Sequence, residues 1–204
     1  MRKTLAVLLV VSMLMIMASC AGGAGMNKDI GKVFATVCSA DEALALAKSS
    51  DVVVIEEQGC TSGQKVWDSF YKDVSAGKAA SVLVADYYTL DNANMSEELY
   101  EQEKDQYPQL YFCLVKFDGK KYSIDTRLST SSESEKQETY NCLQHYTGDA
   151  PTEDALYDKY EYYVLTDDAD VTWDEIMASM LDSSTPEFIK HYTVYSNFTG
   201  WKGK

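Results

Sequence analysis

Residues 110–127 are Leu-Tyr-Phe-Cys-Leu-Val-Lys-Phe-Asp-Gly-Lys-Lys-Tyr-Ser-Ile-Asp-Thr-Arg, and this stretch decides the fold. Two runs rich in β-branched and aromatic residues flank Asp118-Gly119, a dipeptide typical of type I′ turns. The pattern predicts a β-hairpin with Asp118-Gly119 as its two-residue loop. The expected pairs are Phe117 with Lys120, Val115 with Tyr122, and Cys113 with Ile124. One face of the hairpin would be apolar and the other mixed, as in a sheet with one buried side.

Further strands and helices are predicted on both sides of the hairpin. Runs of β-branched and aromatic residues predict strands at 51–55, 81–89, 138–146 and 159–165, and an edge strand at 188–198. Helices are expected after capping residues, which are Ser39, Thr61 or Ser62, Asn94, and Thr172. Trp67 and Phe70 would fill the space between helix and sheet. The fold class is therefore α+β: a largely antiparallel β-meander sheet with two or three helices packed mainly on one face.

The N-terminus has the composition of a secretion signal. Arg2 and Lys3 precede an apolar stretch at 5–17, too short for a comfortable bilayer crossing. The following Met17-Ala18-Ser19-Cys20 resembles the lipobox of bacterial lipoproteins, which predicts cleavage before Cys20 and its lipidation. Acyl chains on Cys20 would hold the protein at the extracytoplasmic face of the cell membrane. The alternative is ordinary cleavage after Ala21 and secretion.

These features predict the division of the chain. Residues 1–19 would be the lipoprotein signal peptide and residues 20–36 a tether. Residues 37–198 would form a single α+β globular domain, followed by a C-terminal tail at 199–204. The chain has 46% hydrophobic residues and three prolines, so one domain can bury its own core.

The chain is strongly acidic, with 32 acidic residues against 18 basic ones and a net charge of −14. Such a surface repels phosphate groups, which argues against nucleic-acid binding. It suits a cationic partner or a metal ion, but solvated acidity on a secreted protein is the better explanation.

Five cysteines are present. If Cys20 carries lipid, four remain outside the cytosol, where disulfides form. Three pairings of these four are possible, and a strand is expected to separate Cys113 from Cys142. Cys38 and Cys60 lie just outside neighbouring elements, so this pair is the predicted disulfide. No Cys-x-x-Cys spacing indicates zinc, and no metal site or cofactor is predicted.

The sequence contains no recognisable catalytic motif. It lacks a Gly-x-Ser-x-Gly elbow and phosphate-binding glycine loops, and its two histidines, His145 and His191, are expected on strands. The acids at 167–175 lack calcium-loop spacing and are better explained as the acidic start of a helix.

Tyrosine is abundant, with 15 residues. Cross-strand aromatic pairs are the ordinary explanation. The second interpretation is a ligand-facing row of rings formed by Tyr87, Tyr111, Tyr122, Tyr140 and Tyr162.

The order of segments is also familiar. A helix, Asp51-Val52-Val53, a Trp-bearing helix, Val82-Leu83-Val84, and Phe117-Asp118-Gly119-Lys120-Lys121-Tyr122 together resemble an uncharacterised family of small lipoproteins and secreted proteins of Gram-positive bacteria. The resemblance covers about 51–165 and departs at the long insertion 91–108. It implies a fold and no activity, so it assigns no catalytic residue.

The leading hypothesis is a membrane-tethered, non-enzymatic domain that binds an envelope protein, peptide or glycan. The alternatives are an extracellular hydrolase that uses a sheet carboxylate, Asp86 or Asp125, and a structural spacer without a ligand. An enzyme predicts Asp86, Asp125 or His145 in a concave pocket, with a raised carboxyl pKa.

Overall fold

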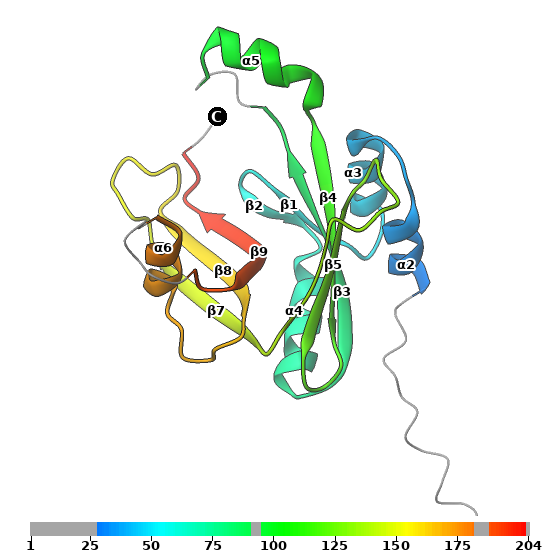
Figure 1. The fold of residues 1–204 in the computed structure, drawn as a ribbon, viewed down its shortest axis with the longest axis vertical. Coiled ribbons are helices and arrows are strands. Elements are labelled where there is room, and N and C mark those ends of the chain that lie inside the picture. The colour runs from blue at the N-terminus through cyan, green and yellow to red at the C-terminus, as the bar shows by residue number, and fades with distance from the viewer. Residues whose placement is uncertain (1–27, 91–94, 182–187, 203–204) are drawn as a thin grey trace, which may run out of the picture.

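The computed structural model describes residues 28–90, 95–181 and 188–202 (Figure 1). The predicted signal peptide and Cys20 lie outside these residues. The helices are α2 (Lys28–Ala35), α3 (Ala40–Lys48), α4 (Gln64–Ser75), α5 (Glu97–Glu103) and α6 (Trp173–Leu181), with a 3₁₀ helix at Lys104–Gln106. The strands are β1 (Val53–Glu56), β2 (Gly59–Ser62), β3 (Ala80–Tyr88), β4 (Gln109–Phe117), β5 (Tyr122–Leu128), β6 (Lys136–Tyr140), β7 (Cys142–Asp149), β8 (Lys159–Thr166) and β9 (His191–Thr199).

The nine strands form one curled sheet in the order β6-β5-β4-β3-β1-β2-β9-β8-β7. Its two outermost strands, β6 and β7, are consecutive in the chain and separated by Asn141 alone. In a flat sheet these strands would lie about 38 Å apart at roughly 4.8 Å per strand, far beyond the roughly 3.5 Å that one residue spans. The sheet must therefore curl until its ends meet, as Figure 1 shows.

The α+β class and the mostly antiparallel sheet are confirmed, but the simple meander is wrong. β1 pairs with β3 in parallel, through partners such as Val54 and Ala85. The last strand, β9, lies between β2 and β8, whereas the sequence predicted an edge strand. Local hydrophobic patterns do not encode strand order, which explains this error.

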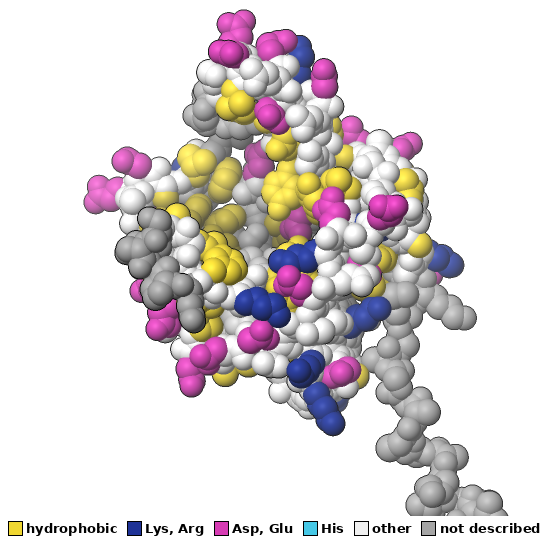
Figure 2. All heavy atoms as spheres, in the orientation of Figure 1, with side chains coloured by type: hydrophobic (Ala, Val, Ile, Leu, Met, Phe, Trp, Pro, Cys, Tyr) yellow, Lys and Arg dark blue, Asp and Glu magenta, His cyan; other side chains and the backbone are white. Residues whose placement is uncertain are grey.

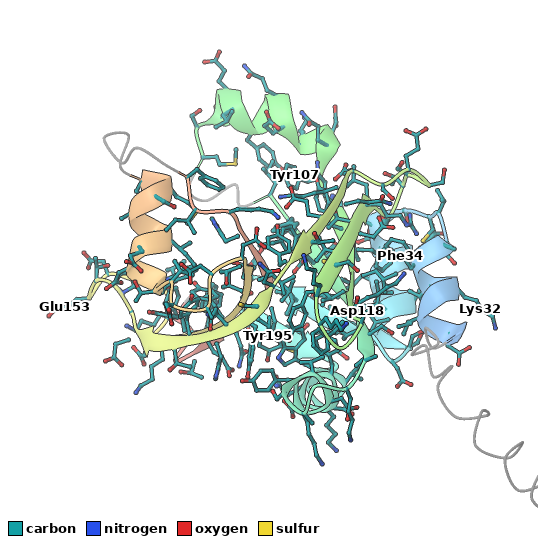
Figure 3. The ribbon with its side chains drawn as sticks, turned by 60° about the horizontal axis from the view of Figure 1, so that its bottom comes forward. Lys32, Phe34, Tyr107, Asp118, Glu153 and Tyr195 are labelled. Carbon is teal, nitrogen blue, oxygen red and sulfur yellow. The ribbon has the colours of Figure 1, made fainter. Side chains whose placement is uncertain are left out.

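The concave side of the sheet encloses one hydrophobic cluster. It contains residues of strands near both ends of the sheet, such as Tyr140 on β6 and Leu165 on β8, so it lies inside the curl. The α4 helix adds Trp67 and Phe70, as predicted. The Trp67 ring stacks on Tyr195 with centroids 4.6 Å apart. Figure 3 shows Tyr195 in this interior above α4.

The described residues contain five α-helices, where two or three were predicted. Some of them cover the convex side of the sheet, which also corrects the expectation of helices mainly on one face. α2 and α3 pack over the outer residues of β1, β3 and β4 in a second cluster. Ile30 and Val33 on α2 are each only 4% exposed. The predicted tether therefore extends too far, because the packed part of the chain includes residues from α2 onward.

Arg127 fastens this N-terminal segment to the sheet. Its guanidinium donates hydrogen bonds to the backbone oxygens of Phe34, Thr36, Leu128 and Ser131. The side chain lies over the ring of Phe34, with its Cζ atom 5.1 Å from the centroid. Arg127 is 2% exposed, so these carbonyl groups replace the water that the buried charge has lost.

The β4–β5 hairpin is confirmed, but its register differs from the prediction by two residues. Phe117 pairs with Tyr122 and Val115 with Ile124. Asp118 becomes the closing position and accepts hydrogen bonds from the N–H groups of Lys120 and Lys121 at 2.7 and 2.8 Å. Gly119, with φ +97°, then occupies the first loop position. A two-residue shift keeps every side chain on its predicted face.

Helix starts agree with the sequence where the capping box is complete. Ser39 with Glu42 and Thr172 with Glu175 form reciprocal bonds. The predicted caps of α4 are wrong, because Thr61 and Ser62 belong to β2 and Gly63 occupies the N-cap with φ +80°. Ser96 caps α5, while the predicted Asn94 lies outside the described residues.

The predicted C-terminal tail is packed where it is described. β9 extends to Thr199, and the Trp201 ring contacts Phe198 with centroids 6.1 Å apart. Lys202 Nζ lies 2.9 Å from Asp158 Oδ1. These residues continue the domain.

Candidate functional site

A cleft of about 430 Å³ lies between the ends of β1 and β3 and the strand β9. In Figure 2 the molecule is hollowed between α5 and β9, and hydrophobic side chains are visible inside the hollow. The cleft is lined by Ile55, Glu56, Glu57, Asp86, Tyr87, Tyr88, Thr89, Tyr192, Thr193, Tyr195, Ser196 and Phe198. Three lining side chains are acidic, five are aromatic and none is Lys, Arg or His.

Asp86 reaches the cleft because of strand alternation. It follows Val82 and Val84 on the face of β3 that lines the inside of the curl. Its neighbours in the sheet are Ile55 on β1 and Tyr111 on β4. The apolar alternation of β3 thus ends in a carboxylate at the edge of the enclosed core.

The Asp86 carboxylate has no hydrogen bond or ion pair with any residue that the structure describes, and it is half-buried. Burial raises the pKa of Asp86 to about 7, because loss of water penalises the charged form. Asp86 is therefore an acid that changes charge near neutral pH while facing a cleft.

The other two acids of the cleft are already engaged. Glu56 Oε2 lies 2.7 Å from Lys48 Nζ and accepts a hydrogen bond from Thr61. Partial burial acts to raise the pKa of Glu56, but these bonds outweigh it and hold the pKa below its usual value. Glu57 accepts a hydrogen bond from the hydroxyl of Thr89. Asp86 is the one lining carboxylate without such a partner among the described residues.

Tyrosine rings and one thiol surround Asp86. The Tyr88 ring contacts the Tyr111 ring edge to face, with centroids 5.9 Å apart. Burial, followed by the charge of Asp86, raises the pKa of Tyr88 to about 12. Burial is also the main reason why the pKa values of Tyr192 and of the Cys113 thiol are raised. These groups are neutral at physiological pH. The positive charge recorded beside them is Lys136, whose Nζ lies 5.4 Å from the centroid of the Tyr192 ring and is paired with Glu138.

The five predicted ligand-facing tyrosines do not share a face, so that prediction is wrong. Tyr111 lies inside the curl beside Asp86. Tyr122 and Tyr140 pair across β5 and β6 in the buried core. Tyr87 donates from its hydroxyl to Asp41 Oδ1 at 2.7 Å, on the α3 side of the sheet. The ring of Tyr162 contacts the ring of Trp173 at the start of α6, with centroids 4.8 Å apart.

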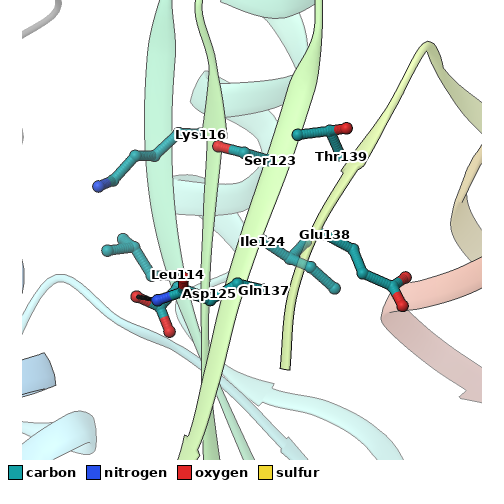
Figure 4. Close-up of a pocket in the computed structure, with 8 residues that line it drawn as sticks. All are labelled: Leu114, Lys116, Ser123, Ile124, Asp125, Gln137, Glu138 and Thr139. Carbon is teal, nitrogen blue, oxygen red and sulfur yellow. Dashed lines mark hydrogen bonds between the residues drawn. The ribbon is translucent and has the colours of Figure 1, made fainter. Parts of the chain in front are cut away.

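Asp125 lies in a different groove, on the outer face of β4, β5 and β6 (Figure 4). It pairs with Leu114 on β4, whereas Asp86 belongs to the inner face. Gln137 Nε2 donates to Asp125 Oδ2 at 3.2 Å, so this carboxylate already has a partner. Its second oxygen, Oδ1, is buried without a hydrogen bond among the described residues.

The two histidines are engaged elsewhere. His145 Nε2 lies 2.8 Å from Glu161 Oε1, and the imidazole stacks on the Tyr163 ring with centroids 4.2 Å apart. His191 Nδ1 lies 2.7 Å from the backbone oxygen of Ile189. Neither histidine lines the cleft, so the structure does not combine Asp86, Asp125 and His145 into one catalytic set.

The predicted disulfide between Cys38 and Cys60 is not formed, and both cysteines are free thiols. Cys38 packs against the outer cluster under α2 and α3, whereas Cys60 packs against the inner cluster. The sheet separates the two thiols, which adjacency in the sequence could not reveal. Within the described ranges, no three His, Cys, Asp or Glu side chains are grouped to hold a metal ion.

The sequence indicated Asp86 only as an isolated candidate and did not indicate Tyr192. The strand containing Tyr192 was expected at an edge, so its approach to β3 could not be foreseen.

No described helix is both long and apolar enough to cross a bilayer. Comparisons with protein-family models, curated proteins and solved structures gave no match to this chain.

Proposed function

We propose that this protein is a lipid-anchored extracytoplasmic domain that binds a small ligand in the cleft between β1, β3 and β9. The observation that carries the proposal is the partnerless Asp86 carboxylate in a cleft with aromatic walls. A half-buried acid without a partner lowers the stability of the free protein, and a ligand that satisfies it recovers that free energy. The size of the cleft falls in the range of small-molecule sites.

The lipid anchor is part of the same proposal. Cleavage before Cys20 and acylation of its sulfur would place the cleft outside the cytosol, where it meets solutes of the envelope. Mass spectrometry of the membrane fraction should find diacylglyceryl-Cys20, and Cys20→Ala should release the protein from the membrane. A soluble mature form that starts at Gly22 contradicts the anchor but leaves the cleft untouched.

An extracellular hydrolase is the second candidate, and the raised pKa of Asp86 favours it. An acid with a pKa near 7 can serve as a general acid or base. However, Glu56 and Glu57 are engaged, and no histidine lines the cleft to form a catalytic pair. Binding therefore has the stronger support. Turnover of glycoside, ester or peptide substrates that Asp86→Asn abolishes would reverse this ranking.

The test of binding is a fragment screen followed by NMR, with two matched variants. Thr193 and Thr139 are both exposed strand threonines, and they line the cleft and the outer groove respectively. We expect fragments to shift amide signals around the cleft, with binding lost in Thr193→Trp and kept in Thr139→Trp. Fragments that bind Thr193→Trp normally, or a screen without hits in the cleft, would contradict the proposal.

A further inference from the structure

The charge of the cleft identifies the class of its ligand, an inference that rests on the proposed function. The cleft holds three carboxylates and no basic side chain. Two lysines approach residues of the cleft, and each already has an acidic partner. Lys48 Nζ lies 2.7 Å from Glu56, which lines the cleft. Lys136 Nζ lies 5.4 Å from the centroid of the Tyr192 ring and 3.4 Å from Glu138. The cation that neutralises Asp86 is thus expected to come with the ligand.

A metal ion is a poor match for this site. Calcium takes six to eight oxygen ligands and magnesium about six in an octahedron. Asp86 is the one uncommitted carboxylate of the cleft, because Glu56 and Glu57 have partners. A single carboxylate instead suits a monovalent organic cation, which needs one counter-charge.

The aromatic walls favour the same class. An ammonium group is attracted to the face of an aromatic ring, and its methyl or methylene groups pack against that face. Tyr88 and Tyr192 each lie close enough to Asp86 for its charge to raise their pKa values, so the rings and the carboxylate act on the same space. Phe198 lines the same cleft.

We propose that the cleft binds a small organic ammonium ion, with Asp86 as its counter-charge and the rings of Tyr88 and Tyr192 as its apolar contacts.

The test is an NMR titration of the full chain with choline as the probe. The neutral isostere 3,3-dimethylbutan-1-ol replaces the charged nitrogen by carbon, and calcium chloride tests the metal alternative. Choline should shift cleft signals and bind at least about tenfold more tightly than the isostere, as expected for one charge pair in a partly desolvated site. Equal affinity for the isostere, or calcium binding at Asp86, would overturn the inference.

Two matched variants separate charge from shape. Asp86→Asn should weaken choline binding at least about tenfold, whereas Asp125→Asn, in the outer groove, should leave it unchanged. Choline binding that survives Asp86→Asn refutes the inference. If uncharged fragments occupy the cleft and Thr193→Trp blocks them while choline fails to bind, the proposed binding function stands and the ligand class is wrong.

A pH series gives an independent readout, because choline is cationic at every pH. The cleft also holds Glu56, which is paired with Lys48, and Glu57, which accepts a hydrogen bond from Thr89. The other titratable groups around Asp86 are Tyr88 on β3, Tyr111 and Cys113 on β4, and Tyr192 on β9, and the pKa values of these four are raised. None of them therefore gains or loses a proton between pH 6 and 8. Choline binding should be about tenfold weaker at pH 6 than at pH 8, where Asp86 is ionised. A flat profile would contradict the role of Asp86.

Discussion

Replacing Asp86 by Asn should stabilise the protein above neutral pH. Burial on folding raises the pKa of Asp86 from its ordinary value of 3.8 to about 7, so the folded state holds the proton more tightly than the unfolded state does. Stability must then fall as pH rises from about 4 to 7 and stay level above 7. Asn is nearly isosteric and carries no charge, so this loss disappears in the variant.

The magnitude follows from the shift in pKa. A difference of about 3 pKa units corresponds to about 4 kcal/mol at 1.36 kcal/mol per unit, which is an upper limit. Because solvent still reaches the half-buried carboxyl group, we expect about 2 kcal/mol. The two proteins should be equally stable near pH 4, where Asp86 is protonated in the folded state.

Urea unfolding followed by circular dichroism, at intervals from pH 4 to pH 9, measures this difference. Asp125→Asn is the matched control, since it changes a sheet carboxylate that already has Gln137 as a partner. A constant difference between Asp86→Asn and the original protein across this pH range would refute the reasoning. So would a lower stability of Asp86→Asn at pH 8.

Two substitutions and one labelling experiment test the fold. Arg127→Lys should lower the free energy of unfolding by about 3 kcal/mol in urea titrations, because one ammonium group cannot reach the carbonyls of two separate segments. A loss under about 1 kcal/mol contradicts the proposed role of Arg127 in linking these segments. Gly63→Ala should lower the free energy of unfolding more than Gly77→Ala does. Both glycines have positive φ, but a Cβ at Gly63 would lie 2.3 Å from a backbone oxygen. Equal losses of stability in the two variants would contradict this close contact at Gly63. Alkylation of the unreduced protein followed by mass spectrometry should modify both Cys38 and Cys60 in denaturant, whereas a mass two units lower would restore the predicted disulfide.

Local chemistry explains which parts of the fold were predictable. The capping boxes at Ser39 and Thr172 and the Trp67 and Phe70 pair depend on residues within one or two helical turns. The hairpin was also local, yet its register shifted because the Asp118 side chain binds two backbone N–H groups, which favours Asp118 outside the loop. A turn dipeptide therefore indicates a hairpin more reliably than its exact register.

Long-range pairing could not be deduced from these patterns. The placement of β9 between β2 and β8 depends on curling of the whole sheet, to which no single segment contributes a distinctive signal. This placement brings Tyr192 towards Asp86 and creates the cleft. The candidate site was thus predictable only as one isolated carboxylate on β3, and the row of five tyrosines failed because alternation and pairing send them to different faces.

The most direct test of the central claim is a carbon-13 NMR titration of the Asp86 side-chain carboxyl group, assigned by comparison with Asp86→Asn. The account predicts a midpoint near pH 7 in the free protein and a lower midpoint when choline is bound, because a cation stabilises the charged carboxylate. A midpoint near 4 that choline leaves unchanged would mean that Asp86 is already solvated or paired, and the cleft would lose its basis as a cation site.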